Sequence, residues 1–349
     1  MSMAPESDTP PATNAEPTNG WFRFRQRING PILGLIIVLG IFLLLVGIKG
    51  ELGTFFSLAN LQVLVHGNTI PAIVALGSLA VMVSGGIDLS VGSVVALVTV
   101  VTMQVFRHTY FRTESQVLAS VLAVAAGLAV GGLCGLVNGL IISGLRVPPF
   151  VTTLGMLSIA RGLAIWISKG QTLSLPSGVR PAWVVALSEI ASPHLLFDPG
   201  FWSLVILAVG TAVLLKRTVL GRYCYAIGSN EATARLCGIP IGRSKILLYS
   251  LAGMLTGWAG ILSFARISGN PSSNAGLELL VIAGVVIGGA SLRGGRGTVI
   301  GTMLGILILG VLENGVSAFD VPVEVKYILI GGIIIANTAM SQLRSAQED

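Results

Sequence analysis

Charged side chains make up only 10% of the 349 residues, and this scarcity is the first constraint on the fold. Soluble domains carry roughly 25% charged residues, so 21 Lys and Arg with 15 Asp and Glu cannot cover a water-facing surface of this size. Hydrophobic residues reach 53%, and the mean hydropathy is +0.86. The composition excludes an ordinary soluble protein and indicates that lipid surrounds most of the chain.

Aromatic residues are also scarce, at 6% of the chain, whereas glycine is abundant, with 45 residues. Outer-membrane β-barrels need aromatic girdles and strands of alternating polarity. Glycine within long apolar runs is typical of membrane helices that pack closely together. These observations predict an all-α fold, that of a polytopic helical membrane protein.

Cysteine and histidine number only three each, and neither type clusters. The cysteines form no C-x-x-C pair, which gives no support to a disulfide framework or a zinc site. The histidines match neither a metal-ligand spacing nor a Ser/His/acid arrangement. The residues concerned are Cys134, Cys224 and Cys237, and His66, His108 and His194. We therefore predict no metal site, no catalytic residue and no cofactor bound by this chain.

A nucleotide-binding motif is missing as well. The sequence contains no G-x-x-x-x-G-K-[ST] segment, the loop that cradles ATP phosphates, so ATP would have to be hydrolysed by another polypeptide. The net charge of +6 does not indicate a nucleic-acid partner, because the basic residues are scattered between apolar runs and not gathered on one face with aromatic residues. Membrane lipid is the expected surrounding.

Ten stretches of the chain contain no Asp, Glu, Lys or Arg. They are residues 28–48, 52–87, 89–106, 115–145, 147–160, 199–215, 246–265, 279–292, 297–312 and 327–343. Most reach the roughly 17–25 residues needed to cross about 30 Å of hydrocarbon. The 147–160 stretch can continue to Ser168, whereas 279–292 is short enough to be tilted, broken or partly re-entrant. We predict about ten transmembrane helices.

The longest stretch, 52–87, is interrupted by His66-Gly67-Asn68-Thr69-Ile70-Pro71. Such a break in a membrane helix is tolerated only where the freed backbone groups face protein or a water-lined cavity. We therefore predict a discontinuous helix beside a pathway. The candidate polar lining of that pathway is Asn68, Thr69, Asp88, Thr152 and Thr153. Such groups can offer a neutral, weakly hydrogen-bonding route to a polar solute.

The charge pattern also predicts domain limits and orientation. Residues 1–27 form an N-terminal tail whose first part is polar and without apolar periodicity, which predicts disorder. The transmembrane domain is expected to span 28–344, and residues 345–349 form a second tail. Ten helices counted from a cytoplasmic N-terminus place 13 of the 21 Lys and Arg in cytoplasmic segments and 7 outside, with Arg161 within a span. This bias satisfies the positive-inside rule with both termini in the cytoplasm of a multi-pass inner-membrane protein.

Glycines recur at four-residue intervals in two of the apolar stretches, which places each set on one stripe of an α-helix. The sets are Gly127, Gly131, Gly135 and Gly139, and Gly297, Gly301 and Gly305. A stripe without Cβ atoms lets another backbone approach closely. We favour packing within one subunit over a contact between subunits.

Asp88 lies at the junction of two apolar stretches, in the segment Gly85-Gly86-Ile87-Asp88-Leu89-Ser90. Acidic residues in or near the membrane are costly and by default mark function. The alternative is that Asp88 caps the N-terminus of the next helix by accepting backbone N–H bonds. Both roles are open from the sequence, and capping is the simpler.

Residues 216–245 form the one substantial basic loop, with six Lys or Arg and a single acid. The signals of a short helix follow one another here: a cap at Ser229 or Asn230, an acid at Glu231, a left-handed stop at Gly238 and a terminator at Pro240. This helix can be a rigid knob that fits a cleft in a cytoplasmic partner. It can also be an amphipathic connector that lies on the membrane surface.

Four segments, in this order and spacing, are similar to a known family. They are Ser84–Ser93 (SGGIDLSVGS), Pro148–Gly162 (PPFVTTLGMLSIARG), Gly221–Gly238 (GRYCYAIGSNEATARLCG) and Val286–Gly297 (VIGGASLRGGRG). The chain resembles membrane subunits of bacterial ATP-binding-cassette importers of the ribose, xylose and autoinducer permease family. The resemblance covers nearly everything after residue 30.

The resemblance implies that the 216–245 loop contains the segment that docks into a nucleotide-binding subunit. It assigns this coupling role to Gly228, Asn230, Glu231, Ala232, Arg235 and Gly238. Family members commonly have Gly-Gly-Asn where this chain has Gly228-Ser229-Asn230.

The function implied is import of a sugar or sugar-like solute across the bacterial inner membrane, driven by ATP that a separate subunit hydrolyses. The implied partners are an ABC ATPase subunit, a periplasmic solute-binding protein and a second permease subunit, most simply another copy of this chain. Two alternatives are a stand-alone secondary transporter or channel, and an ABC permease for amino acids or nucleosides. A stand-alone carrier leaves the coupling-like loop without a role.

Overall fold

A computed structural model of the chain describes residues 52–190 and 196–318, together with the isolated positions 35–36, 40, 328 and 331–332. Within these ranges the regular structure is helical, apart from one isolated bridge between Leu173 and Gly269. The predicted all-α class is therefore confirmed. Both predicted tails, the 28–48 and 327–343 stretches and His194 lie largely or wholly outside the described residues.

Seven of the described helices are long and apolar enough to cross a membrane. They are α3 (Leu58–Val83), α4 (Val91–Thr113), α5 (Gln116–Gly144), α6 (Pro149–Ser168), α8 (Pro199–Arg217), α11 (Ile241–Ile267) and α13 (Val299–Ala318). The shorter helices are α2 (Leu52–Phe55), α7 (Ala182–Ser188), α9 (Val219–Ser229), α10 (Glu231–Leu236) and α12 (Leu277–Ile287). The eight predicted stretches from 52–87 to 297–312 each coincide with α3 to α6, α8 or α11 to α13. The total of about ten spans stays a prediction.

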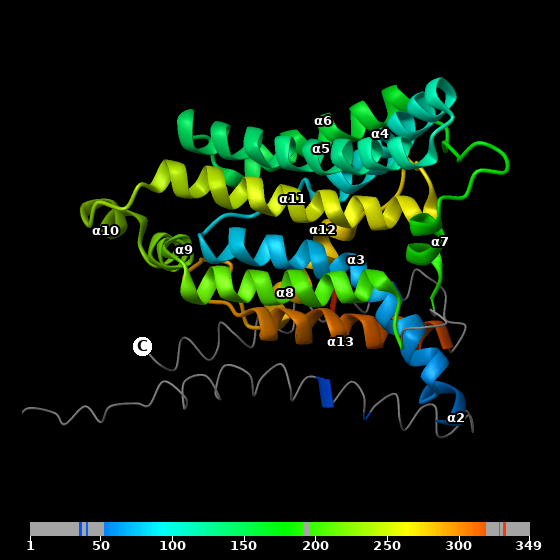
Figure 1. The fold of residues 1–349 in the computed structure, drawn as a ribbon. Helices are drawn as coiled ribbons and strands as arrows, with labels where there is room; N and C mark the ends of the chain where they lie inside the picture. The colour runs from blue at the N-terminus through cyan, green and yellow to red at the C-terminus, as the bar shows by residue number, and fades with distance from the viewer. Residues whose placement is uncertain are drawn as a thin grey trace, which may run out of the picture.

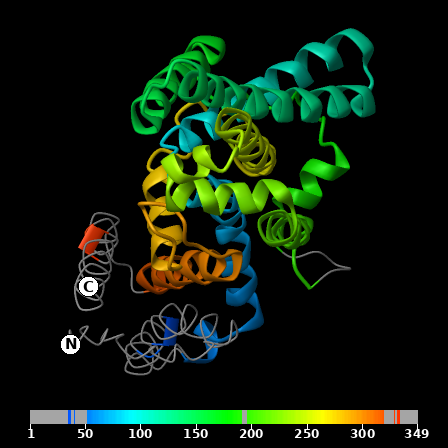
Figure 2. The ribbon, with the colours of Figure 1, turned by 90° about the vertical axis from the view of Figure 1, so that its left-hand side faces the viewer.

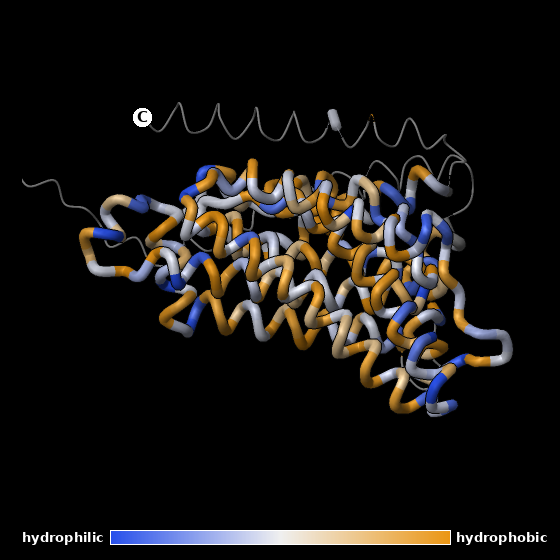
Figure 3. The backbone as a smooth tube through the Cα atoms, turned by 90° about the horizontal axis from the view of Figure 1, so that it is seen from above, coloured by the Kyte–Doolittle hydropathy of each residue, from blue (hydrophilic) through white to orange (hydrophobic). Residues whose placement is uncertain are grey.

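The long helices form an antiparallel bundle with two distinct ends. Figure 1 shows α9 and α10 at one end, here called the α10 end, and α7 at the other, the α7 end. Figure 2 shows α5 and α6 along one edge of the bundle and α13 on the far side, with α11 between them. In Figure 3 hydrophobic residues follow the helices, while many hydrophilic residues gather toward the two ends. This distribution suits a bundle whose long axis crosses a bilayer.

The predicted break at residues 66–71 is wrong, because α3 runs through Pro71 as one helix. Asn68 Nδ2 and Thr69 Oγ1 donate to the carbonyls one turn earlier, at 2.7 and 2.8 Å, and so satisfy their polarity within the helix. Almost every residue from 69 to 83 is buried by neighbouring helices. That surrounding packing holds a proline-containing helix together where the local sequence alone favours a break.

The interruptions at membrane depth lie elsewhere, in two non-helical segments that follow α3 and α11. Segment 84–90 starts from the α10 end, and segment 268–276 starts from the α7 end. After the second segment, the 11 residues of α12 extend only about 16 Å, too short to cross a membrane. This agrees with the prediction that 279–292 is a short span, which left open whether it is tilted, broken or partly re-entrant.

The glycine stripe of α5 packs against α11, which confirms the predicted contact within one subunit. A Cβ on Gly131 would lie 2.6 Å from the Cα of Gly257, and one on Gly139 would lie 2.7 Å from the Cα of Ile246. Both distances are shorter than real Cβ atoms tolerate, so glycine alone permits this approach. In the second set, Gly301 and Gly305 pack on α12, whereas Gly297 precedes α13 and contacts α3.

We expect Gly135→Ala to destabilise the bundle, because its methyl group would collide with the Tyr249 carbonyl on α11. Overpacking of this kind costs about 1–3 kcal/mol. Gly210→Ala on α8 is the matched control, since no atom lies within 4 Å of its Cβ position. Thermal unfolding in detergent should show a lower midpoint for Gly135→Ala alone. Equal midpoints in both variants would contradict the close approach of α5 and α11.

Candidate coupling and translocation sites

The short helix α10 has the start and stop that the sequence predicts. Asn230 is its N-cap, and the side-chain Oδ1 accepts the backbone N–H of Thr233 at 2.9 Å. Gly238 follows with a φ of +76°, a left-handed conformation that favours glycine. Pro240 then caps the next helix, α11. Figure 1 shows α10 beyond the ends of the spanning helices, which favours the rigid knob over a surface-lying connector.

Glu231 fastens this knob to the membrane helices. Its Oε2 lies 2.7 Å from Nζ of Lys245, on the first turns of α11, and its Oε1 lies 3.1 Å from the Arg235 guanidinium. The hydrogen bond from Lys245, with that from Arg235, holds the pKa of the Glu231 carboxyl below its ordinary value. Glu231 is thus an internal tie that sets the direction of α10, as well as an acid at a helix start.

Gly228 marks the place where the loop meets the bundle. A Cβ on Gly228 would collide with the carbonyl of Val83 and lie 2.6 Å from the amide nitrogen of Gly295. These two groups are themselves joined, because Gly295 N–H donates to Val83 O at 2.9 Å. Nearby, Tyr225 Oη donates to the carbonyl of Gly297 at 2.8 Å. The end of α9 therefore packs against the end of α3 and the loop before α13.

The exposed tip of the knob is partly apolar. Leu236 is 89% exposed, beside the exposed side chains of Ala232 and Arg235. Sequence reasoning missed Leu236 and Lys245. A helix of six residues is too short for helical periodicity to show which side chains face outward. The contact of Lys245 with Glu231 depends on the way the chain folds back after α10.

Asp88 and Thr153 come together around segment 84–90. Asp88 is 6% exposed, and its Oδ1 accepts the Ser90 backbone N–H at 2.8 Å and the Ser90 hydroxyl at 2.6 Å. Ser90 immediately precedes α4 and makes no side-chain cap hydrogen bond, whereas Asp88 accepts a backbone N–H at the start of this helix, as the capping alternative expects. Asn138 Nδ2 donates to Ser90 Oγ at 3.2 Å, and Thr153 Oγ1 donates to the Ile87 carbonyl at 3.1 Å.

This first group lies toward the α10 end of helices that are long and apolar enough to cross a membrane. Asn138 precedes the last residue of α5 by six positions, or about 9 Å along the helix. Thr152 is on the same turn of α6 as Thr153 and donates to the Pro148 carbonyl at 3.3 Å. Side-chain hydrogen bonds thus hold the non-helical backbone of segment 84–90 in place.

Asn68 and Thr69 form a separate group nearer the α7 end. Asn68 precedes the last residue of α3 by 15 positions, about 22 Å along the helix, whereas Asp88 follows that end. The side-chain amide of Asn68 occupies the place that a Cβ on Gly310 of α13 would take, and Thr69 is fully buried. The structure therefore places the five candidate lining residues in two groups, both packed inside one subunit.

Two further charges lie at membrane depth, at the second non-helical segment. Arg161 of α6 donates to the carbonyls of Pro271 and Ser273, at 2.7 and 3.1 Å. Glu278 on the first turn of α12 is close enough to interact electrostatically with Arg161, and its Oε2 is buried against Gly92 without a hydrogen-bond partner. Glu278 is an intramembrane acid that the sequence analysis did not single out, although it borders the 279–292 stretch.

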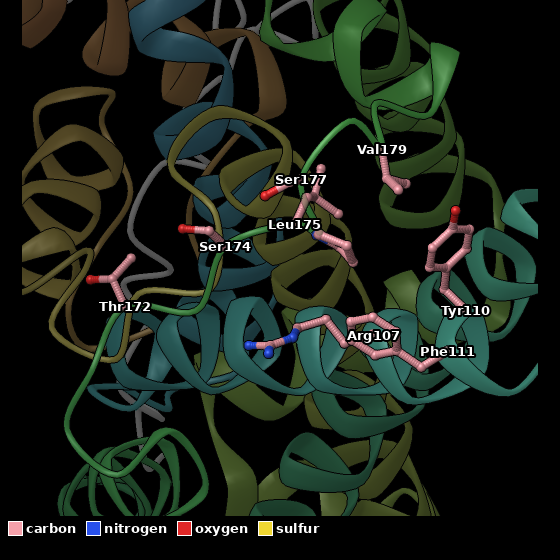
Figure 4. A pocket seen from close by; sticks show the side chains of 9 residues that line it. Arg107, Tyr110, Phe111, Thr172, Ser174, Leu175, Ser177 and Val179 are labelled. Atoms are coloured by element: carbon pink, nitrogen blue, oxygen red, sulfur yellow. The ribbon is translucent and has the colours of Figure 1, made fainter. Parts of the chain in front are cut away.

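An open pocket of about 580 Å³ lies at the α7 end, between α4 and segment 172–179. Figure 4 shows Arg107, Tyr110 and Phe111 of α4 facing Ser174 and Ser177 across it. This pocket lies at the opposite end of the bundle from α10. Among the residues that the structure describes, no three His, Cys, Asp or Glu side chains gather closely enough to hold a metal ion.

Comparison with known proteins identifies the family of the chain. The family model for the branched-chain amino acid transport system / permease component matches residues 60–338. The chain belongs to this permease family. This permease is 36% identical over 295 residues to the ribose import permease protein of Escherichia coli (strain K12), covering 84% of this chain and 89% of that protein.

Two further relatives transport other sugars by name. The L-arabinose ABC transporter permease protein of Azospirillum brasilense is 33% identical over 304 residues, covering 84% of this permease and 83% of that protein. The fructose import permease protein of Rhizobium meliloti is 32% identical over 316 residues, covering 89% and 84%. No solved structure matches. The chain is thus the permease component of a transporter and a multi-pass inner-membrane protein.

Proposed function

We propose that this permease moves a sugar or sugar-like solute inward across the bacterial inner membrane, using ATP hydrolysed by a separate subunit. The observation that carries the proposal is the position of α10. Glu231 of α10 forms an ion pair with Lys245 of α11, and Gly228, just before α10, packs against Val83 at the end of α3 and Gly295 in the loop before α13. Such a connection supports a role in transmitting a movement of a partner outside the bilayer to the membrane helices. The sugar specificity follows the relatives, whose names give ribose, arabinose and fructose.

The proposed partners are an ABC ATPase at the α10 end, a periplasmic solute-binding protein at the α7 end, and a second permease subunit, most simply another copy of this chain. The proposed coupling residues of loop 216–245 are Gly228, Asn230, Glu231, Ala232, Arg235 and Gly238, with the ATPase contact on α10 and the contact with the bundle at Gly228. The open pocket between α4 and segment 172–179 suits a docked extracytoplasmic partner. A permease for amino acids is the second candidate, because the family description names branched-chain amino acids.

The solute route is proposed to pass the non-helical segments, with Asp88, Thr152 and Thr153 on one side and Asn68 and Thr69 nearer the α7 end. Support comes from backbone freed at membrane depth in segments 84–90 and 268–276. Four of these side chains are buried within one subunit, and that of Asn68 is half-buried. Their use in transport therefore requires the segments to shift when the knob moves.

Co-purification from native membranes tests the complex. We expect the chain to retain an ABC ATPase subunit, identified by mass spectrometry, and a solute-binding protein when the matching sugar is present. Isolation of the chain alone, with solute transport under an ion gradient and no ATPase, would overturn the proposal.

We expect the α10 end to face the cytoplasm. It carries loop 216–245 with Arg146, Arg293 and Arg296, and the positive-inside rule places such a cluster inside. Single cysteines at Ser229 and Ser177, in a variant without native cysteines, should react with an impermeant thiol reagent from opposite sides. Labelling of Ser229→Cys from the periplasmic side would reverse the orientation of every span.

A further inference from the structure

Two carboxylates are buried in the part of the chain that the structure describes, and their surroundings differ in charge. Asp198 has a counter-charge, because Nη2 of Arg266 lies 3.4 Å from its Oδ2. Asp88 has none, since no Lys, Arg or His side chain among the described residues lies within 4 Å of it. A buried charge without a partner is strongly unfavourable, so the charge of Asp88 must be balanced by another group.

The polar groups around Asp88 satisfy only one of its two oxygens. Oδ1 accepts both the backbone N–H and the hydroxyl of Ser90, whereas no described residue donates a hydrogen bond to Oδ2. The N-terminus of α4 begins two residues after Ser90's neighbour Leu89, and its dipole amounts to about half an elementary charge. The helix therefore balances the carboxylate only in part.

A cavity of about 10 Å³ adjoins Asp88 where segment 84–90 meets α4, α5 and α11. This volume has room for one species of the size of a water molecule. Its polar lining consists of Asp88, Ser90, Cys134, Asn138 and Thr256. Oδ1 of Asn138 is buried without a hydrogen-bond partner, because the amide donates through Nδ2 to Ser90 Oγ. The cavity thus lies between a carboxylate and an amide that each have an unused oxygen.

A third unpartnered oxygen lies nearby on α11. Oη of Tyr249 is buried, has no hydrogen-bond partner and packs against Gly86 of the same segment. Tyr249 is close enough to Asp88 to interact electrostatically with it. Segment 84–90 is therefore bordered by oxygen atoms and by one uncompensated negative charge.

We propose that Asp88 and Asn138 bind a monovalent cation of the size of Na⁺ in this cavity. A cation satisfies both unused oxygens and supplies the missing positive charge. Ca²⁺ takes six to eight oxygen ligands, most often several carboxylates, and this cavity offers one carboxylate. Non-helical segments between membrane helices are places where transport proteins coordinate Na⁺.

The ion joins segment 84–90 to α5, in addition to the hydrogen bond between Asn138 and Ser90. Na⁺ takes oxygen ligands and needs no cluster of His, Cys and acids, the pattern on which the prediction of no metal site was based. This inference goes beyond the proposed function, and its test involves no transport.

Thermal unfolding of the full-length permease in detergent measures the binding. The chain is heated in NaCl or in choline chloride at equal ionic strength, because choline is too large for a cavity of one water molecule. An ion that binds only the folded chain raises the midpoint, on the order of 3 °C at about ten times its dissociation constant. We expect a saturable rise with Na⁺ and none with choline.

Asp88→Asn is the test variant, since it keeps the shape of the side chain and removes its charge. We expect its midpoint to be the same in both salts. In choline chloride it should be at least as high as that of the unchanged chain, because no unpaired charge remains. Asp198→Asn is the matched control: Arg266 already balances this carboxylate, so the response to Na⁺ should persist. Glu114→Gln, at an exposed acid, controls for a general effect of salt.

Equal midpoints of the unchanged chain in the two salts at neutral pH would overturn the inference, since the cavity would then hold water or Asp88 a proton. A response of Asp88→Asn equal to that of the unchanged chain would also overturn it, because the ion would bind elsewhere. Asn138→Ala decides the case in which Asp88→Asn does not fold. Loss of this second ligand should weaken Na⁺ binding by about 10-fold or more, and an unchanged affinity would contradict the site.

Discussion

Leu236→Asp is expected to release the ATPase subunit from the permease. Leu236 is 89% exposed on α10, and a side chain of this size is worth about 1.5–3 kcal/mol when a partner buries it. Its loss should weaken ATPase binding by about 10- to 100-fold, and burying an unpaired carboxylate should weaken it further. Pull-down of the ATPase with the solubilised permease measures the effect.

Leu236→Met is the matched control, because it keeps an apolar side chain of similar volume. We expect it to retain the ATPase and to support uptake. Neither variant changes a spanning helix, so both should reach the membrane in normal amounts. Full ATPase retention by Leu236→Asp would mean that the tip of α10 is not the docking surface.

The second large effect is expected from Gly228→Ala, which should uncouple ATP hydrolysis from transport. The added methyl group would collide with the Val83 carbonyl and the Gly295 amide, and forcing them apart costs about 1–3 kcal/mol. The surface of α10 that contacts the ATPase would remain, but the packing of α9 against the end of α3 and the loop before α13 would change. We therefore expect ATPase binding to persist while solute uptake falls to background.

Gly242→Ala at the same end of the bundle controls for a general effect of glycine replacement. A Cβ there would meet only Ser143 Cβ, at an ordinary contact distance of 3.8 Å. This variant should transport normally. A normal transport rate in Gly228→Ala would mean that the packing of α9 against α3 and the loop before α13 does not couple α10 to the membrane helices.

The parts of the fold that local rules control could be predicted from the sequence. Asn230 and Gly238 bound α10 because a cap and a left-handed stop depend on residues a few positions apart. The α5 stripe was also predictable, since its four-residue spacing places the glycines on one face whatever packs there.

The rest depended on contacts between distant parts of the chain. Pro71 favours a break locally, yet packing around α3 keeps the helix intact. The interruption at 84–90 is held by Asn138, 48 positions from its partner Ser90, and by Thr153, 66 positions from its partner Ile87. Lys245 meets Glu231 only because the chain reverses after α10. No local pattern contains these pairings.

Uptake in reconstituted proteoliposomes tests the central claim most directly. Vesicles hold this permease with its co-purified ATPase and binding protein, and radiolabelled ribose, arabinose and fructose are offered with or without ATP on the ATPase side. We predict uptake of at least one of these sugars that requires ATP, the ATPase subunit and an intact Leu236. Uptake at the same rate by the permease alone, without ATP and under an ion gradient, would contradict the account.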